Sequence, residues 1–209
     1  MEKVLNLACK ALAALLSISF VLATSCGQAD YVPKPKGYPK VYLPKPGYAQ
    51  LSLPLPYSFL LSKYAKAEPD SDRYAEPNWI DIYYPAYDAT IEVTYKAMSG
   101  RKGELNEYIE LARKLTNKHQ VKASGILEKN IITRSGHIAH VFRLTGQVPT
   151  QYQFFVTDSS HNFLRGALYF KTATANDSLK PMIDYISRDL DTLLSSLTWQ
   201  SSPSPKGKR

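Results

Sequence analysis

The chain has 209 residues and a formal net charge of +8 at neutral pH, with 26 Lys and Arg against 18 Asp and Glu. Its only cysteines are Cys9 and Cys26, and Cys9 lies in a leader that we expect to be removed, which excludes a disulfide framework and a thiolate zinc site. A basic chain often binds nucleic acid, but export from the cytoplasm argues against that partner. Anionic lipid head groups, cell-wall polymer or an acidic protein are the alternatives, beside the simpler interpretation that the charge is spread over the surface for solubility.

The first thirty residues have the pattern of a secretory signal. Two lysines give a basic start, and an apolar stretch follows from Ala11 to Ala23. That stretch is shorter than the length of about 20 residues that a membrane-spanning helix needs, and no other segment is long and apolar enough. Small residues at positions 23–25 lead to Cys26, which resembles a bacterial lipobox. We expect residues 1–25 to be removed and Cys26 to carry lipid; the alternative is ordinary cleavage that leaves a free thiol.

Residues 26–60 form a segment rich in proline and tyrosine. Seven of the 14 prolines lie between residues 31 and 60, and eleven of the 15 tyrosines lie between Tyr31 and Tyr95. Proline favours extended backbone, so we expect an extended segment with short strands at Val41–Leu43 and Ala49–Leu53. Its rings either pack onto the domain or form an aromatic strip that binds a sugar polymer or a peptide.

The globular domain is expected to span residues 61–199 and to begin with a polar loop at residues 61–77. Two stretches of alternating apolar and polar residues, Trp79–Pro85 and Thr90–Tyr95, predict a β-hairpin around the turn Tyr87–Ala89. Apolar residues at helical spacing then predict an amphipathic helix at residues 104–119.

Four β-rich stretches follow that helix. They pair as two hairpins, with turns at Ser135-Gly136 and at Asp158–His161; the stretches are residues 121–134, 137–145, Gln151–Thr157 and Asn162–Phe170. Both faces of the last hairpin carry apolar side chains, which predicts a sheet that is covered on both sides.

The last predicted element is a helix at residues 178–198. Asn176, Asp177 and Ser178 can cap its start, and Pro181 lies in the first turn, where a missing N–H costs little. The tail at residues 200–209 is polar and basic, which is typical of a disordered end. The order of elements predicts an α+β domain in which an antiparallel sheet lies between helices, a pattern that resembles the PsbP/Mog1-type sandwich.

No group of residues in the sequence predicts catalysis. His137 and His140 are three apart in an expected strand and would point to opposite faces, and His119 lies near a helix end. Asp158, Ser159 and His161 fall within one tight turn, whereas a catalytic triad is usually assembled from separate segments. Paired carboxylates for sugar hydrolysis remain open; the candidates are Asp81, Asp88 and Glu92. We expect no enzyme activity, no cofactor and no metal.

The concentration of aromatic residues supports a different hypothesis, an envelope lipoprotein that binds or hydrolyses peptidoglycan or polysaccharide. Its stacking platforms would be Trp79, Tyr83, Tyr84 and Tyr87.

Several motifs together resemble the GldD gliding-motility lipoproteins of Bacteroidetes. The motifs are Tyr31-Val32-Pro33-Lys34-Pro35-Lys36-Gly37-Tyr38, Pro56-Tyr57-Ser58-Phe59, Trp79-Ile80-Asp81-Ile82 with Tyr84-Pro85, Ala89-Thr90-Ile91, Leu111-Ala112, Phe154 to Asp158, Phe163-Leu164-Arg165-Gly166-Ala167-Leu168-Tyr169-Phe170, and Asn176-Asp177-Ser178-Leu179 with Pro181. The resemblance implies a lipid-anchored envelope component of gliding motility, linked with type IX secretion and without an established active site.

This resemblance sets the expected location and partners. We expect the domain to face the periplasm from the inner or the outer membrane, and to contact other motility and secretion proteins or a cell-wall polymer. The candidate partner-binding residues are Tyr31, Pro33, Pro35, Gly37, Tyr38, Trp79 and Tyr83.

Overall fold

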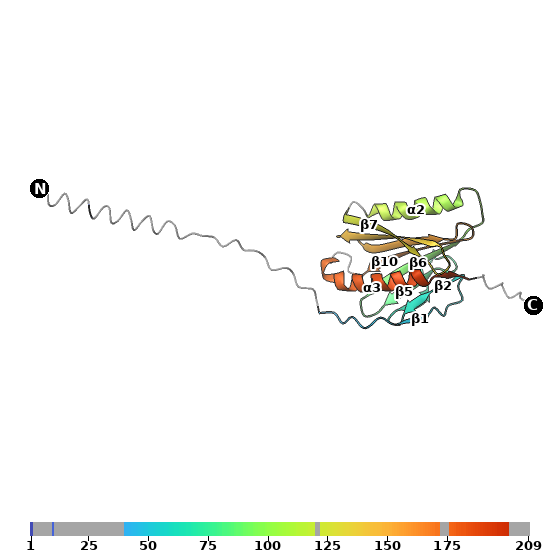
Figure 1. Ribbon diagram of the computed structural model, residues 1–209, viewed down its shortest axis with the longest axis horizontal. Coiled ribbons are helices and arrows are strands. Elements are labelled where there is room, and N and C mark those ends of the chain that lie inside the picture. The colour runs from blue at the N-terminus through green and yellow to red at the C-terminus, as the bar shows by residue number, and fades with distance from the viewer. Residues whose placement is uncertain (2–9, 11–39, 120–121, 172–175, 201–209) are drawn as a thin grey trace, which may run out of the picture. The chain divides into compact units, whose positions relative to one another are not determined.

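The computed structural model describes residues 40–119, 122–171 and 176–200, together with Met1 and Lys10. The chain divides into two units, Met1–Lys36 and Gly37–Arg209, and all elements below belong to the second (Figure 1). The proposed lipid site Cys26, the motif at residues 31–38 and the tail from residue 201 lie outside the described residues.

A seven-stranded antiparallel sheet is the centre of the fold. Its order from edge to edge is β4 (Lys66–Pro69), β5 (Ile80–Tyr84), β6 (Ala89–Ala97), β10 (Asn162–Phe170), β9 (Thr150–Thr157), β8 (Ile138–Gly146) and β7 (Ala123–Ile132). The three predicted hairpins are therefore confirmed as β5–β6, β7–β8 and β9–β10. The pairing of β6 with β10 joins the half made of β4, β5 and β6 to the half made of β7, β8, β9 and β10.

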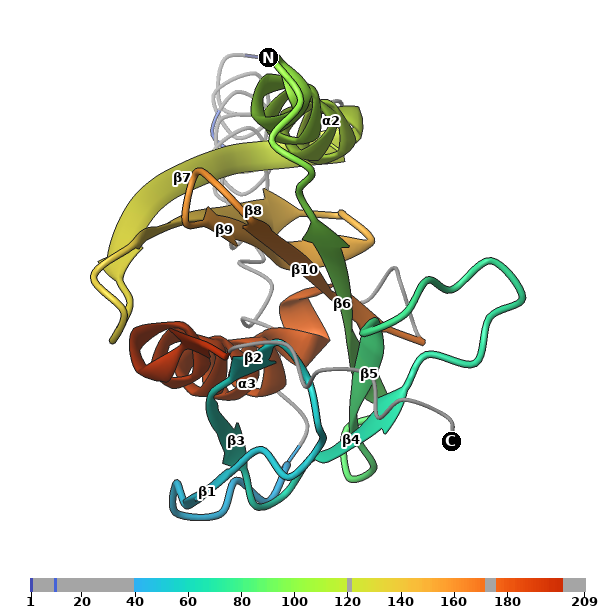
Figure 2. The same cartoon turned by 90° about the vertical axis from the view of Figure 1, so that its right-hand side faces the viewer.

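Two helices cover opposite faces of this sheet. The longer helix α3 (Asn176–Ser196) lies in the concave face, and α2 (Glu104–Lys118) lies on the convex face (Figure 2). Both were predicted, but the expected end of α3 at residue 198 is wrong. The helix ends at Ser196 because Thr198 and Trp199 form strand β11, which pairs with Tyr57 and Ser58.

Two apolar clusters fill the spaces on either side of the sheet. The larger one joins the concave face to α3 through residues such as Ile82, Leu168 and Leu190, and the smaller one joins α2 to the convex face through Phe142 and Phe155. Strands β9 and β10 contribute to both clusters, as their two apolar faces predicted. The predicted α+β class, with an antiparallel sheet between helices, is confirmed.

The described part of the Pro/Tyr-rich segment covers the side of α3 that faces away from the seven-stranded sheet (Figure 2). It forms β1 (Tyr48–Gln50), which pairs with β3 (Leu60–Ser62), and β2 (Tyr57–Ser58), which pairs with β11. The apolar side chains of Leu51, Tyr57 and Phe59 are buried in the larger cluster. Between residues 40 and 60 the rings therefore serve mainly as packing groups, although Tyr42 is exposed.

Two predictions in this region are wrong and one is partly confirmed. No strand forms at Val41–Leu43, and the expected loop at residues 61–77 contains β4 and the end of β3. A strand does form near Ala49–Leu53, but it is the shorter Tyr48–Gln50. Strands β1 to β4 are two to four residues long, so local alternation is too brief to reveal their bounds.

Candidate functional site

The convex face of the sheet is divided into a covered half and an open half. Helix α2 packs over β9 and β10, whereas β4, β5 and β6 carry no helix on that side within the described part of the chain (Figure 2). We call the outward side chains of this half the open face; they are Lys66, Glu68, Asp81, Tyr83, Thr90, Glu92 and Thr94, with Arg165 and Tyr169 beside them.

The open face has a row of three carboxylates across neighbouring strands. Glu68 lies directly opposite Asp81, and Asp81 lies directly opposite Glu92. Like charges at such positions destabilise a sheet. Desolvation by burial and the negative charge of Asp70 raise the pKa of Asp81. Desolvation and the charge of Asp81 likewise raise the pKa of Glu92, and the positive charge of Arg165 partly offsets this rise. The row is a concentrated negative charge on a basic protein.

A hollow of about 440 Å³ continues this row toward the loop between β4 and β5. Its walls combine acidic and aromatic side chains, and its lining residues are Asp70, Ser71, Asp72, Tyr74, Trp79, Asp81 and Glu92. The loop holds its shape because the carboxylates of Asp70 and Asp72 accept the backbone N–H groups of Asp72 and Tyr74, each at 2.8 Å.

Trp79 is fixed at the edge of the hollow. Its indole N–H donates to the carbonyl oxygen of Tyr95 at 2.8 Å, and the Lys96 ammonium lies 5.3 Å from the ring centre. Lys96 also pairs with Glu76. The ring is half-buried and packs against the larger cluster, so its exposed part is held in a fixed position at the edge of the hollow.

The four aromatic platforms that the sequence suggested do not share one surface. Tyr83 is 38% exposed on the open face, and its hydroxyl lies 3.3 Å from Asp88. Tyr84 and Tyr87 are buried on the other side, where Tyr84 donates to Asp189 of α3 and Tyr87 packs edge-on against Tyr185. Their prediction as stacking platforms is wrong, because Tyr84 continues the inward-facing pair Ile80 and Ile82.

The turn at residues 158–161 has a structural role. The Asp158 carboxylate accepts N–H groups from Ser160, His161 and Asn162 at 2.8–2.9 Å. Burial opposes its ionisation, but these bonds and the Asn162 side chain outweigh that effect and lower its pKa well below the usual range. Its acceptor sites are thus occupied by the turn itself.

The histidines and the paired carboxylates considered for metal binding or catalysis do not come together in one site. His140 stacks on Phe155 with ring centres 4.8 Å apart, and His137 lies edge-on to Trp199. Asp81 and Glu92 project side by side from the same convex face and do not face each other across a cleft. Among the described residues, no group of three His, Cys, Asp or Glu side chains is placed to hold a metal ion.

Sequence reasoning found Trp79, Tyr83, Asp81 and Glu92 but missed the rest of this surface. Glu68, Asp70, Asp72 and Tyr74 lie in the stretch that was expected to be a plain polar loop. One signal for strand β4 was available in the sequence. Ala67 faces inward, and its polar neighbours Lys66 and Glu68 face outward, which is the alternation of a strand.

Fold and surface together define an α+β domain whose sheet has one open face with aromatic and acidic side chains. The family model for the gliding motility lipoprotein GldD matches residues 28–199, and the chain belongs to this family. Membership implies a lipoprotein that is associated with a membrane of the cell envelope. Among the described residues, no helix has the length and apolar character to cross a bilayer.

Other comparisons add a distant likeness. No curated protein matches the chain. Among solved structures, it is similar to the solution structure of cyanobacterial PsbP (CyanoP) from Synechocystis sp. PCC 6803, with 11% identity and a TM-score of 0.42. That match covers 73% of this chain and 92% of the PsbP chain.

Proposed function

We propose that the protein is a lipid-anchored subunit or assembly factor of the gliding-motility and type IX secretion apparatus, and that it acts by binding other envelope proteins without catalysis. The observation that carries the proposal is the open face. Family membership supports the link with motility, and the expected lipid on Cys26 supports attachment to a membrane.

The open face has the composition of a docking surface. Aromatic side chains with a polar tip are enriched at protein interfaces, and Trp79 and Tyr83 are of this kind. The like charges of Asp81 and Glu92 oppose folding, and local features that cost stability are common at functional sites. A partner segment that brings lysine or arginine to this row would remove the repulsion.

A lipid on Cys26 would keep the start of the domain within reach of a membrane. Thirteen residues lie between Cys26 and Lys40, where the described domain begins, and the 14 residue steps span at most about 50 Å. Residues Tyr31, Pro33, Pro35, Gly37 and Tyr38 lie on this connection and are proposed as further partner contacts. The domain faces the periplasm in this proposal, on the inner or the outer membrane.

The test is a mild-crosslinking pull-down of the tagged chain from cell envelopes. The wild-type chain is compared with the double variant Trp79→Ala/Tyr83→Ala and with Leu111→Ala, which removes an exposed apolar side chain from α2. We expect the wild type and Leu111→Ala to recover other motility or secretion proteins, and the double variant to lose them. Recovery of none by the wild type would contradict the proposal.

A second candidate is binding of a cell-wall polymer. It is favoured by the hollow in which Trp79 and Tyr74 stand beside four carboxylates, a combination that suits a sugar ring. It predicts that the wild-type chain sediments with peptidoglycan and that Trp79→Ala does not. Equal sedimentation of the two folded proteins would remove this candidate.

A further inference from the structure

The two edges of the seven-stranded sheet differ in their protection. Strand β4 has four residues and ends at Pro69, and a short edge with proline resists further pairing. Strand β7 has ten residues and pairs only with β8 among the described strands. Two large apolar side chains on β7 are exposed, Leu127 at 62% and Ile132 at 73%. A long, apolar edge of this kind offers its backbone to another strand.

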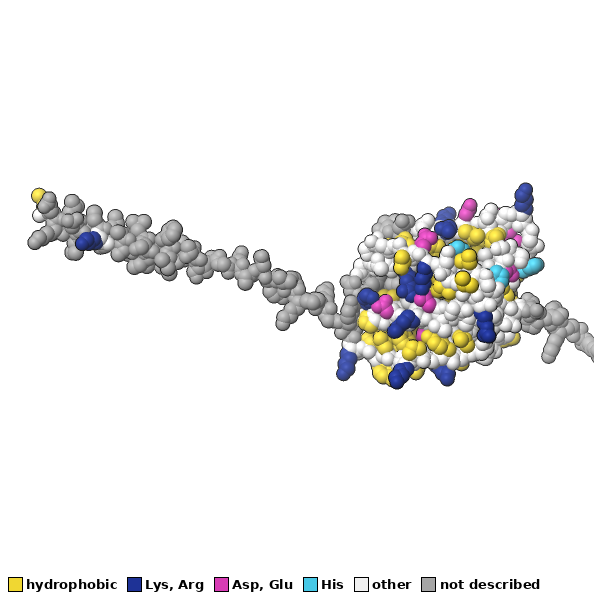
Figure 3. Space-filling model, viewed as in Figure 1, with side chains coloured by type: hydrophobic (Ala, Val, Ile, Leu, Met, Phe, Trp, Pro, Cys, Tyr) yellow, Lys and Arg dark blue, Asp and Glu magenta, His cyan; other side chains and the backbone are white. Residues whose placement is uncertain are grey.

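A groove lies beside this edge, on the side that faces α3. It is a hollow of about 340 Å³ between β7, β8 and the first half of α3. Its apolar side chains are those of Leu127 and Ile183, and Arg143 borders it. Ile126 and Leu144 also line the hollow, but they pack in the smaller cluster on the α2 side of the sheet. Figures 1 and 3 share one orientation, in which β7 and α3 both face the viewer. Over these two elements, Figure 3 shows basic, acidic and hydrophobic side chains close together.

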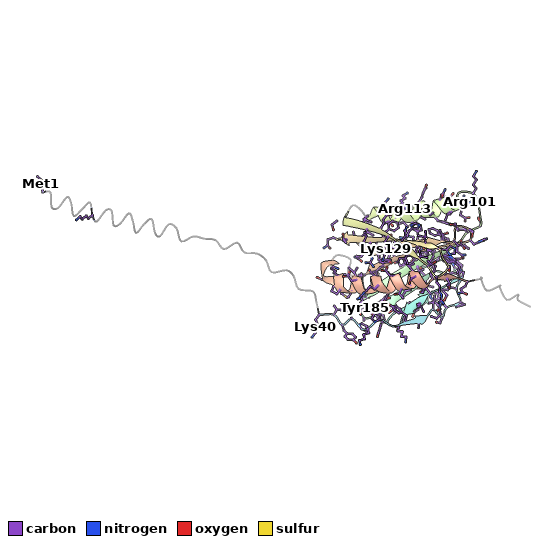
Figure 4. All side chains as sticks on the ribbon, in the orientation of Figure 1. Met1, Lys40, Arg101, Arg113, Lys129 and Tyr185 are labelled. Atoms are coloured by element: carbon purple, nitrogen blue, oxygen red, sulfur yellow. The ribbon has the colours of Figure 1, made fainter. Side chains whose placement is uncertain are left out.

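Arg143 at the border of the groove and Lys129 beside it share one carboxylate, which leaves an excess of positive charge next to the groove. Lys129 and Arg143 both donate to the single carboxylate of Asp191, at 2.6 and 3.0 Å, and Tyr152 donates to its other oxygen at 2.6 Å. Figure 4 labels Lys129 on β7, above α3 in that view. Asp184, on the opposite wall, already pairs with Lys180. The Nε atom of Arg143 is buried and has no hydrogen-bond partner among the described residues.

We propose that β7 and α3 together bind an extended segment of another envelope protein, which adds to the sheet as an eighth strand beside β7. Backbone hydrogen bonds to β7 would give affinity, and the hollow would take apolar side chains from alternate positions. Lys129 and Arg143 share the single carboxylate of Asp191, so their remaining positive charge favours a segment that carries one carboxylate. A second copy of this chain fits less well, because it would bring two positive grooves together. This site lies on the other side of the sheet from the open face.

The first arm of the test keeps the protein unchanged and varies the probe. The full chain in detergent is titrated with a labelled peptide of alternating valine and threonine with one central glutamate, and anisotropy is measured. Two further peptides carry N-methyl groups on alternate residues, offset by one position. Because a strand turns alternate N–H groups to its partner, we expect one N-methylated form to bind normally and the other about tenfold more weakly. Replacing the glutamate with lysine should weaken binding by about fivefold.

The second arm varies the protein. Leu127→Lys should weaken binding of the unmodified peptide by about tenfold, whereas Ile132→Lys, on the same strand but the opposite face, should change it by less than about twofold. Both side chains are exposed, so both variants should fold, which circular dichroism checks. Absence of saturable binding, equal binding of the two N-methylated forms, or equal effects of the two variants would overturn the proposal. Dimerisation of the peptide-free chain that Leu127→Lys abolishes would also overturn it.

Discussion

The hydroxyl of Tyr48 donates a hydrogen bond of 2.8 Å to the carboxylate of Asp189, which lies 141 residues later in the chain. Tyr84 donates to the second oxygen of the same carboxylate at 3.1 Å. Asp189 is only 4% exposed. One buried carboxylate in α3 is thus satisfied by phenols from β1 and from β5, which ties the Pro/Tyr-rich segment to the core.

Removing the Tyr48 hydroxyl should loosen this tie. A hydrogen bond to a charged acceptor contributes about 1.5–3 kcal/mol, so we expect Tyr48→Phe to lower the free energy of unfolding by about that amount. Urea denaturation measures the change. Tyr42→Phe is the control, because its ring is exposed and only its backbone carbonyl takes part in a hydrogen bond, with Tyr87. Equal stability of Tyr48→Phe and wild type would show that the bond does not hold the segment.

The Asp158 turn should make stability depend on acid pH. Its pKa is lowered in the folded state, so its contribution is complete above the unfolded value of about 3.9 and is lost as the pH falls below that value. Because water still reaches the turn, we expect Asp158→Ala to cost about 1 kcal/mol at pH 7 and little at pH 2. Thermal unfolding of both proteins across this range checks the prediction. A cost that stays constant with pH would contradict it.

Neutralising the acidic row should stabilise the protein. The pKa values of Asp81 and Glu92 are raised in the folded state, so their ionisation disfavours folding at pH values above their unfolded pKa. We expect Glu92→Gln to gain about 0.2–1 kcal/mol at pH 7, and to gain nothing below the unfolded pKa. The comparison variant is Glu128→Gln on β7, which lies away from the row and should leave stability unchanged. A loss of stability in Glu92→Gln would mean that the row is a favourable structural feature.

Gly166 should resist any side chain. A Cβ atom added there would overlap with the ring of Phe154, which is buried in the core. We expect Gly166→Ala to cost about 1–3 kcal/mol, because the ring must move. Gly47→Ala is the control, since its new Cβ would meet only Lys63 at 3.6 Å. Similar melting temperatures for the two variants would refute this account of Gly166.

Much of the fold could be predicted because its main strands and helices carry their own periodicity. Strands β5 and β6 alternate buried apolar residues, such as Ile82 and Ile91, with more exposed neighbours, and α3 has a continuous apolar stripe. Of the short strands, only β1 was predicted, with different bounds; β2, β3, β4 and β11 are too short to show a period of their own and are defined by the strands that they pair with. The pairing of Trp199 with Tyr57 is the extreme case.

The site was predicted in part for a similar reason. Trp79 and Tyr83 were identified by residue type, but Tyr84 and Tyr87 were assigned to the same surface although alternation places Tyr84 with Ile82. The acidic row depends on the register that sets Glu68 beside Asp81, and a sequence alone does not give that register.

The most direct measurement is site-specific photocrosslinking in living cells. A photoreactive phenylalanine replaces Tyr83 on the open face, and in a second strain it replaces Leu111 on α2. We expect the probe at position 83 to form a covalent adduct with a motility or secretion protein of the envelope, and the probe at position 111 to form none with that protein. Identical adduct patterns at both positions, or no adduct at position 83 in cells that glide and secrete normally, would contradict the account.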